Sequence, residues 1–199
     1  MVGIQTITLK QYSDQSLVQL FINGEERVLT ELVYRYQSKI FSGIYLLVKD
    51  RYIAEDLFQE TFIKIVSTLR SGKYTDQGKF LPWAMRIAHN LCIDYFRKAK
   101  KNVKITLQDG SDILSLFAYS TENIEQTTIR NQEETTVQKL VDQLPLEQKE
   151  VIIMRIYGEM SFKEIAEVTG VSINTALGRM RYGLINIKRC IEECKLTIR

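Results

Sequence analysis

The sequence of 199 residues has few side chains that support metal or disulfide chemistry. It contains three cysteines, an odd and sparse set that does not make a disulfide framework. Cys190 and Cys194 are four residues apart, which is half of a helical metal site, but no second cysteine pair accompanies them. The only histidine, His89, lies far away in the sequence. We therefore expect reduced, buried thiols, no metal and no cofactor.

The sequence also lacks the residues that an active site would need. No glycine-rich motif could cradle a phosphate, and no nucleophile has a plausible neighbouring base. Helical di-metal proteins need Glu-x-x-His pairs, whereas the residue three before His89 is Arg86. We predict no catalytic residue and expect His89 to be a partly exposed helix residue.

Long apolar runs are missing too. No stretch approaches the roughly 20 apolar residues that span a bilayer. The first residues lack the basic start and apolar core of a secretory signal. These observations predict a cytoplasmic protein without membrane insertion.

Helical periodicity dominates what is present, and no strong strand pattern occurs. The only two prolines, Pro82 and Pro145, both precede helical patterns, where a missing N–H costs little. The first helix is expected to begin at Ser13 or Asp14 and to end near Gly24. Further helices are expected over residues 25–48, 52–70, 81–101, 132–144, 146–157, 162–169 and 173–194.

Charge and composition divide the chain. Residues 86–104 carry six basic side chains against one acid, and residues 105–136 carry six acids against one arginine. A basic patch beside an acidic, weakly periodic segment is typical of a nucleic-acid-binding unit followed by a linker. We predict an all-α protein of two small helical domains joined by a flexible linker. The boundaries are a tail over 1–13, a first domain over 14–101, a linker over 102–131 and a second domain over 132–199.

The second domain contains the sharpest local pattern. Ser161 and Glu164 have the spacing of a capping box at a helix start. Gly170 supplies a tight turn, Val171 is expected to fill the space between two helices, and a longer helix follows. Ala176, Met180 and Leu184 are expected along its buried side. This is the pattern of a helix-turn-helix, whose second helix enters the major groove of DNA.

The exposed residues at the start of that second helix suit base and phosphate contacts. The alternative is an ordinary helical hairpin with a solvated polar face. The candidates for DNA contacts are Ser172, Asn174, Thr175, Arg179, Arg181 and Tyr182.

The helix expected over 81–101 carries a second candidate DNA surface. Polar and basic side chains recur on one stripe at three- or four-residue steps, where phosphates would be attracted. A solvated basic helix end that complements the helix dipole is an equally good interpretation. The stripe and its flanks comprise Arg86, Asn90, Asp94, Arg97, Lys98, Lys100 and Lys101.

Two sequence blocks resemble sigma factors of bacterial RNA polymerase. AEDLFQETFIKIV followed by FLPWAMRIAHNLCIDYFRKAKK resembles region 2, and QLPLEQKEVIIMRIYGEMSFKEIAEVTGVSINTALGRMRYGLINIKR resembles region 4. The match covers nearly everything from Ser13 to Arg189 except the linker. Because the chain lacks the extra regions of housekeeping sigma factors, it is similar to the extracytoplasmic-function (ECF) type.

The resemblance implies a function and partners. The protein would bind core RNA polymerase through the clamp helices of the largest subunit and the flap of the second-largest, and would direct promoter recognition, DNA melting and initiation. An anti-sigma factor is a further candidate partner. The positions that match the clamp-binding face are Asp56, Leu57, Gln59 and Glu60.

The resemblance also implies a pocket for a flipped base of the minus-ten element. The loop over 71–79, with Lys73 and Lys79, and the start of the next helix match the family's base-capturing part. Asn90 matches a position that contacts the captured base. Phe80 and Trp83 are candidates for stacking on unpaired bases, although Trp83 also suits the core.

Some positions depart from the common family pattern. Leu177 stands where many members carry a basic residue, and Gly178 where many carry serine, so base preferences cannot be carried over. A stand-alone helix-turn-helix regulator of duplex DNA and a protein-interaction module remain the alternatives. As a sigma factor, the chain would place its domains on promoter elements about two helical turns apart. In the free chain the domains are expected to fold on each other, aided by the acidic linker.

Overall fold

The computed structural model describes residues 9–74, 78–106 and 140–197. These residues contain no strand, which confirms the prediction of an all-α protein. The elements are η1 (Leu9–Gln11), α1 (Asp14–Ile22), α2 (Val28–Val48), α3 (Arg51–Arg70), α4 (Phe80–Thr106), α6 (Leu146–Ile156), α7 (Phe162–Thr169) and α8 (Ile173–Thr197).

Polar caps explain where two of the N-terminal helices begin. The Ser13 hydroxyl accepts a hydrogen bond from the amide of Ser16 at 3.1 Å, which confirms the predicted start of α1. Asp50 caps α3 in the same way through the amide of Ile53 at 3.0 Å. Helix α4 continues to Thr106, so the first residues of the predicted linker are helical. The rest of that linker, and the predicted helix 132–144 up to residue 139, lie outside the described residues.

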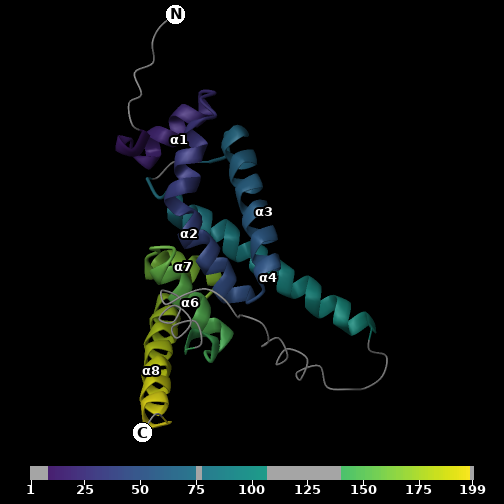
Figure 1. Cartoon of the computed structure of the whole chain (residues 1–199), viewed down its shortest axis with the longest axis vertical. Helices are drawn as coiled ribbons and strands as arrows, with labels where there is room; N and C mark the ends of the chain where they lie inside the picture. Colours follow the sequence, from purple (N-terminus) through teal and green to yellow (C-terminus); the bar gives the residue numbers. More distant parts are fainter. Residues whose placement is uncertain (1–8, 75–77, 107–139, 198–199) are drawn as a thin grey trace, which may run out of the picture.

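Helices α1–α4, the N-terminal helices, pack around one apolar core (Figure 1). Phe80 lies in this core at 1% exposure, with its ring centroid 5.6 Å from that of Tyr36. The prediction that Phe80 stacks on unpaired DNA bases is therefore wrong for this structure, because the ring is enclosed by protein. Other fully buried side chains are Leu17, Leu32, Ile40, Ile44, Ile65 and Leu69.

Helices α6, α7 and α8, the C-terminal helices, form the expected helix-turn-helix. Ser161 and Glu164 make both hydrogen bonds of the capping box, and Gly170 ends α7 in the left-handed region at φ 67°. Ala176 is buried and Met180 packs against the small core of this part, as predicted. Leu184 is 49% exposed, which corrects its predicted burial.

The neighbouring Gly183 gives the reason for the exposure of Leu184. A Cβ atom on Gly183 would lie 2.7 Å from Cδ1 of Ile152, so this position of α8 faces α6 at close range. Consecutive residues of a helix are turned by about 100°. Leu184 is thereby turned away from α6 and toward solvent.

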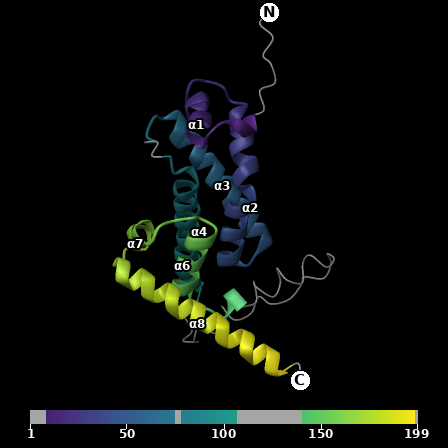
Figure 2. The same cartoon turned by 90° about the vertical axis from the view of Figure 1, so that its left-hand side faces the viewer.

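The N-terminal and C-terminal helices contact each other directly. Helix α6 packs beside α2, and Ile153 of α6 and Val141 belong to the same buried cluster as the N-terminal core. Figure 2 shows α6 beside α4, with α8 crossing below them. None of the described helices is long and apolar enough to cross a membrane.

Candidate nucleic-acid and polymerase interfaces

The predicted basic face of α4 is present on the protein surface. Arg86, Asn90 and Lys98 are exposed. Arg97 is exposed as well, and its guanidinium contacts the carboxylate of Asp94 at 3.3 Å. The side chain of Lys101 lies outside the described residues. The exposed cations face solvent without enough acid beside them to neutralise them, so this surface can attract phosphate.

His89 corrects a prediction. It was expected to be partly exposed, but it is 6% exposed, because α6 covers this side of α4. Its Nε2 atom lies 3.3 Å from a carboxylate oxygen of Glu150, which is 8% exposed. Its Nδ1 atom is buried and has no hydrogen-bond partner. The pair connects α4 with α6 across the contact between the two sets of helices.

The loop before α4 contributes two exposed lysines, Lys73 and Lys79. Residues 75–77 of this predicted base-capturing loop lie outside the described part. Trp83 is half-buried, with its ring 4.3 Å from that of Tyr74 and 5.7 Å from that of Phe80. The structure thus places Trp83 in an aromatic cluster at the base of the loop.

Lys79 is exposed but has an ion-pair partner. Its ammonium group lies 2.8 Å from the carboxylate of Glu164, which belongs to the capping box of α7. Partial burial raises the pKa of Glu164. Lys79 and the hydroxyl and amide of Ser161 have the larger, opposite effect, and the pKa of Glu164 falls to about 2. Glu164 therefore stays ionised near neutral pH and remains available for the ion pair with Lys79.

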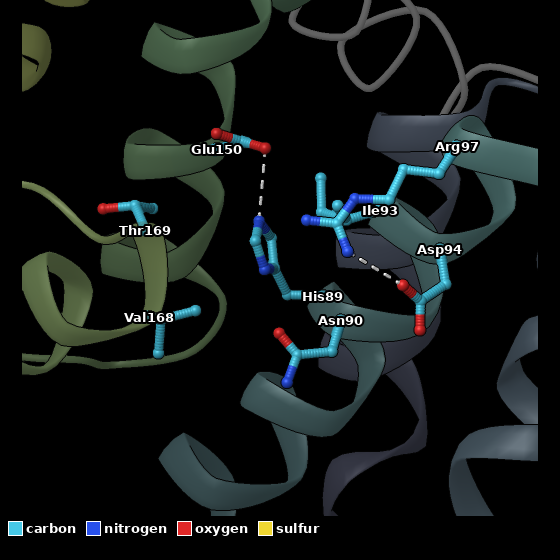
Figure 3. Close-up of a pocket in the computed structure, with 8 residues that line it drawn as sticks. All are labelled: His89, Asn90, Ile93, Asp94, Arg97, Glu150, Val168 and Thr169. Carbon is cyan, nitrogen blue, oxygen red and sulfur yellow. Dashed lines mark hydrogen bonds and ion pairs between the residues drawn. The ribbon is translucent and has the colours of Figure 1, made fainter. Parts of the chain in front are cut away.

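A cavity of about 460 Å³ lies between α4 and the C-terminal helices. In Figure 3, the side chains of α4 line one wall and those of α6 and α7 the other. Sequence reasoning did not find this cavity, because its walls come from segments about 50 to 80 residues apart. A local sequence pattern does not relate residues over such distances. Its lining residues are His89, Asn90, Ile93, Asp94, Arg97, Glu150, Val168 and Thr169.

The predicted recognition helix begins as expected. Ser172 accepts a hydrogen bond from the amide of Thr175 at 3.0 Å, so its hydroxyl caps α8. Asn174, Thr175, Arg181 and Tyr182 are exposed, and Arg179 is half-buried. The structure brings all of the predicted side chains to the first turns of α8. The hydroxyls of Ser172 and Thr175 also contact each other at 2.9 Å, which leaves them less free to read bases.

The predicted polymerase-binding face lies on α3. Asp56, Gln59 and Glu60 are exposed, whereas Leu57 is 7% exposed and belongs to the core. A buried Leu57 can support the face but cannot reach a partner protein. Sequence reasoning missed two exposed apolar side chains on α3, Tyr52 at 80% and Ile63 at 67%.

Helical spacing could have found these two residues. Tyr52, Asp56, Gln59 and Ile63 follow each other at steps of four, three and four, so they share one stripe of α3. Exposed apolar groups beside acids are typical of a protein-binding surface rather than of a simple solvated face.

A second exposed apolar surface lies on the later turns of α8. Leu184, Ile185 and Ile191 are 49%, 50% and 36% exposed. The other side of this part of α8 contacts α6, where the amide of Asn186 donates a hydrogen bond to Gln148 at 2.9 Å. Apolar side chains without a covering element in the described part of the chain suit contact with another protein.

Comparison with known proteins identifies the family. The sigma-70 region 2 family matches residues 32–102, and the sigma-70 region 4 family matches residues 135–177. The RNA polymerase sigma-H factor of Pseudomonas aeruginosa is 29% identical over 176 residues, which are 86% of this chain and 90% of that protein. The ECF RNA polymerase sigma factor SigW of Bacillus subtilis is 27% identical over 174 residues, 85% and 92% of the two chains.

Solved structures share the fold. The sigma factor RpoE, in complex with the anti-sigma factor NepR from Bartonella quintana, matches with a TM-score of 0.67 at 18% identity. That match covers 82% of this chain and 96% of RpoE. CnrH, in complex with the cytosolic domain of CnrY, matches with a TM-score of 0.62 at 20% identity over 92% and 99% of the chains.

The two family matches lie in the order, and on the elements, that the sequence blocks predict. They do not favour a stand-alone helix-turn-helix regulator, because such a protein has no need of region 2. Sigma factors are DNA-binding initiation factors rather than enzymes. The chain belongs to the sigma-70 family and is a sigma factor of the extracytoplasmic-function type, which directs transcription initiation.

Proposed function

We propose that three surfaces divide the work of this sigma factor, which acts in the cytoplasm with RNA polymerase. The acidic and apolar stripe of α3 binds the clamp helices of the polymerase. The basic face of α4 and the loop before it bind the minus-ten element, and the start of α8 binds the minus-thirty-five element. The observation that carries this assignment is that the three faces are exposed on separate helices. They can therefore be occupied by different partners in one complex.

Base capture is assigned to Asn90. Its amide is exposed on α4, with Arg86 and Arg97 on the same helix to hold phosphates. The side chain carries both a donor and acceptor, which suits the edge of an unpaired base.

The change Asn90→Ala is expected to weaken promoter opening by about tenfold, since one to two lost hydrogen bonds are worth about 1 to 2 kcal/mol. Closed-complex affinity should change little, because duplex DNA keeps its bases stacked. Permanganate footprinting measures opening, and filter binding at low temperature measures the closed complex. Arg86→Lys, which keeps the phosphate contact, is the control. An equal loss in both measurements would argue against a base pocket.

Minus-thirty-five binding is assigned to the first turns of α8. Arg179 lies there and is half-buried. Arginine reads guanine through two hydrogen bonds, and a good pair of this kind is worth about 1 to 3 kcal/mol.

The change Arg179→Ala is expected to lower affinity for promoters that need the minus-thirty-five element by about tenfold or more. Promoters that function without this element should respond little. The measurement is transcription by reconstituted holoenzyme on both promoter types. Arg27→Ala, at an exposed arginine outside the assigned surfaces, serves as the matched control. An unchanged response of both promoter types would count against the role of Arg179.

The exposed apolar surface of α8, formed by Leu184, Ile185 and Ile191, is assigned to the flap of the second-largest polymerase subunit. It is separate from the DNA-binding turns, so both contacts can be made together. An anti-sigma factor is a further proposed partner. Support comes from RpoE, a relative in fold, whose structure contains the anti-sigma factor NepR.

The assignment is tested first by mixing the purified chain with sigma-free bacterial core polymerase. Co-elution in gel filtration together with specific transcripts from a genomic library is the expected result. Aligned start sites would then give both promoter elements. Failure to bind a closely related core enzyme, with tight binding to duplex DNA alone, would contradict the proposal.

A further inference from the structure

A glycine inside a helix weakens that helix, because it loses more conformational freedom on folding than alanine does. Most glycines in the described part of the chain have a clear structural reason. Four adopt a positive φ, where other residues are strained, and three lie so close to neighbouring atoms that a Cβ atom would force a shift. The first group comprises Gly24, Gly72, Gly78 and Gly170, and the second comprises Gly43, Gly158 and Gly183.

Gly178 of α8 has neither reason, and among the described glycines it is alone in this. Its φ is not positive, and a Cβ atom on it would meet open space. Gly183 in the same helix differs, because its Cβ atom would lie 2.7 Å from Cδ1 of Ile152. The packing of the protein on itself therefore does not require glycine at position 178, whereas a close contact with another molecule would require it.

Position 178 lies within the surface assigned to the minus-thirty-five element. Consecutive helix residues are turned by about 100°, so this position faces away from the buried Ala176 two residues earlier. Asn174 and Tyr182, four residues before and after Gly178, share its side of the helix and are both exposed. The position between these two candidates for DNA contacts thus carries no side chain.

A position without a side chain can still select a base. Glycine allows a close approach between the backbone of a helix and a ligand, because no Cβ atom keeps them apart. In the major groove the methyl group of thymine is the apolar feature of the base edges, and the other features are hydrogen-bond donors and acceptors. Gly178 has no polar side chain, and its neighbour Leu177 is 43% exposed. This surface therefore suits a methyl group better than a hydrogen-bonding edge.

We propose that Gly178 is a specificity-determining residue of α8, which lets the methyl group of one thymine in the minus-thirty-five element pack against its backbone and Leu177. This inference rests on the proposed function, because it uses the DNA surface assigned to α8. It adds a preference for thymine to the guanine contact assigned to Arg179. A larger side chain at position 178 would hold the helix and the base apart without harming the free protein.

The change Gly178→Ala separates the fold from the contact. In the free full-length chain, alanine should raise the melting temperature by about 1 to 4 °C, because it strengthens the helix and meets open space. Gly183→Ala is the matched control in the same helix and should lower the melting temperature, because its Cβ atom would crowd Ile152. A lower melting temperature for Gly178→Ala would overturn the inference, since this glycine would then serve the fold.

The contact itself is tested with reconstituted holoenzyme on a promoter obtained from the aligned start sites. Gly178→Ala should bind this promoter about tenfold more weakly than the wild type, despite its greater stability. Each thymine of the minus-thirty-five element is then replaced in turn by deoxyuridine, which removes only the methyl group. At one thymine this replacement should weaken binding of the wild type by about threefold or more and should not weaken binding of Gly178→Ala.

The failures of the two proposals are distinguishable. If Gly178→Ala binds the intact promoter as tightly as the wild type, or if every deoxyuridine affects both proteins by the same factor, the methyl contact is wrong while α8 keeps its assigned role. If replacing the whole minus-thirty-five element leaves the affinity of the wild type unchanged, the assignment of α8 is wrong and this inference is overturned with it.

Discussion

Reversing the acids on α3 is expected to abolish most sigma activity. In the double variant Asp56→Lys with Glu60→Lys, affinity for core polymerase should fall by about 100-fold or more, because two carboxylates of the proposed contact are replaced by ammonium groups and misplaced charges at an interface cost several kcal/mol. Promoter-dependent transcription at limiting sigma should fall in parallel. The variant should fold normally, since both side chains are exposed.

The measurement is competition for core polymerase against a labelled reference sigma factor, with thermal unfolding to check the fold. Glu25→Lys with Glu147→Lys is the control, because it makes the same charge change at exposed residues outside the α3 stripe. Its affinity for polymerase should remain within a few-fold of the wild type. A double α3 variant that competes as well as this control would show that the polymerase binds elsewhere.

Much of this α3 face could be predicted from the sequence, and the reason is periodicity. Asp56, Gln59 and Glu60 lie on one side of a helix whose apolar residues mark the other side, so their exposure follows from the pattern alone. Leu57 was assigned to the same face by resemblance, yet one position along a helix turns a side chain by about 100°. The helical period that places Asp56 on the exposed side therefore places Leu57 on the apolar, buried side.

Local signals in the C-terminal part were equally informative. The capping box of Ser161 and Glu164 and the glycine turn depend on residues within three or four positions, and the structure has both. Glu164 also has a second partner that no local pattern contains. Lys79 lies 85 positions earlier, so the contact depends on how the two sets of helices pack.

The errors have the same origin. His89 and Glu150 are 61 residues apart, and only the packing of α6 on α4 buries them together. Phe80 was expected at the DNA surface because the start of this helix resembles the base-capturing part of sigma factors, but its ring is buried in the core beside that of Tyr36 of α2. A sequence predicts the faces of each helix from its own period, whereas the choice of covering helix depends on tertiary contacts.

The same packing encloses a cation, and this leads to the largest expected change in stability. Lys149 of α6 is only 5% exposed and lies near Lys49 and Asp142. Burial, followed by repulsion from Lys49, lowers the pKa of Lys149 to about 8, although Asp142 acts in the opposite direction. Its charged form is therefore disfavoured in the folded state relative to the unfolded chain.

The change Lys149→Met keeps the length of the side chain and removes the ammonium group. We expect the free energy of unfolding at pH 7 to rise by about 1 to 3 kcal/mol, since one unit of pKa shift corresponds to about 1.4 kcal/mol. Denaturant titration measures this change. Lys188→Met, on an exposed turn of α8, is the control and should change the free energy by no more than about 0.5 kcal/mol.

The pH dependence tests the cause of that difference. Between about pH 8 and the unfolded pKa of about 10.4, the unfolded chain binds more protons at Lys149 than the folded protein does. The wild type therefore gains stability from this residue as the pH rises through that window, while Lys149→Met has no such group. The advantage of the variant should be full below pH 8 and should shrink toward pH 10.4. A variant less stable than the wild type at pH 7 would mean that Asp142 more than offsets the burial of Lys149, and that this cation stabilises the folded protein.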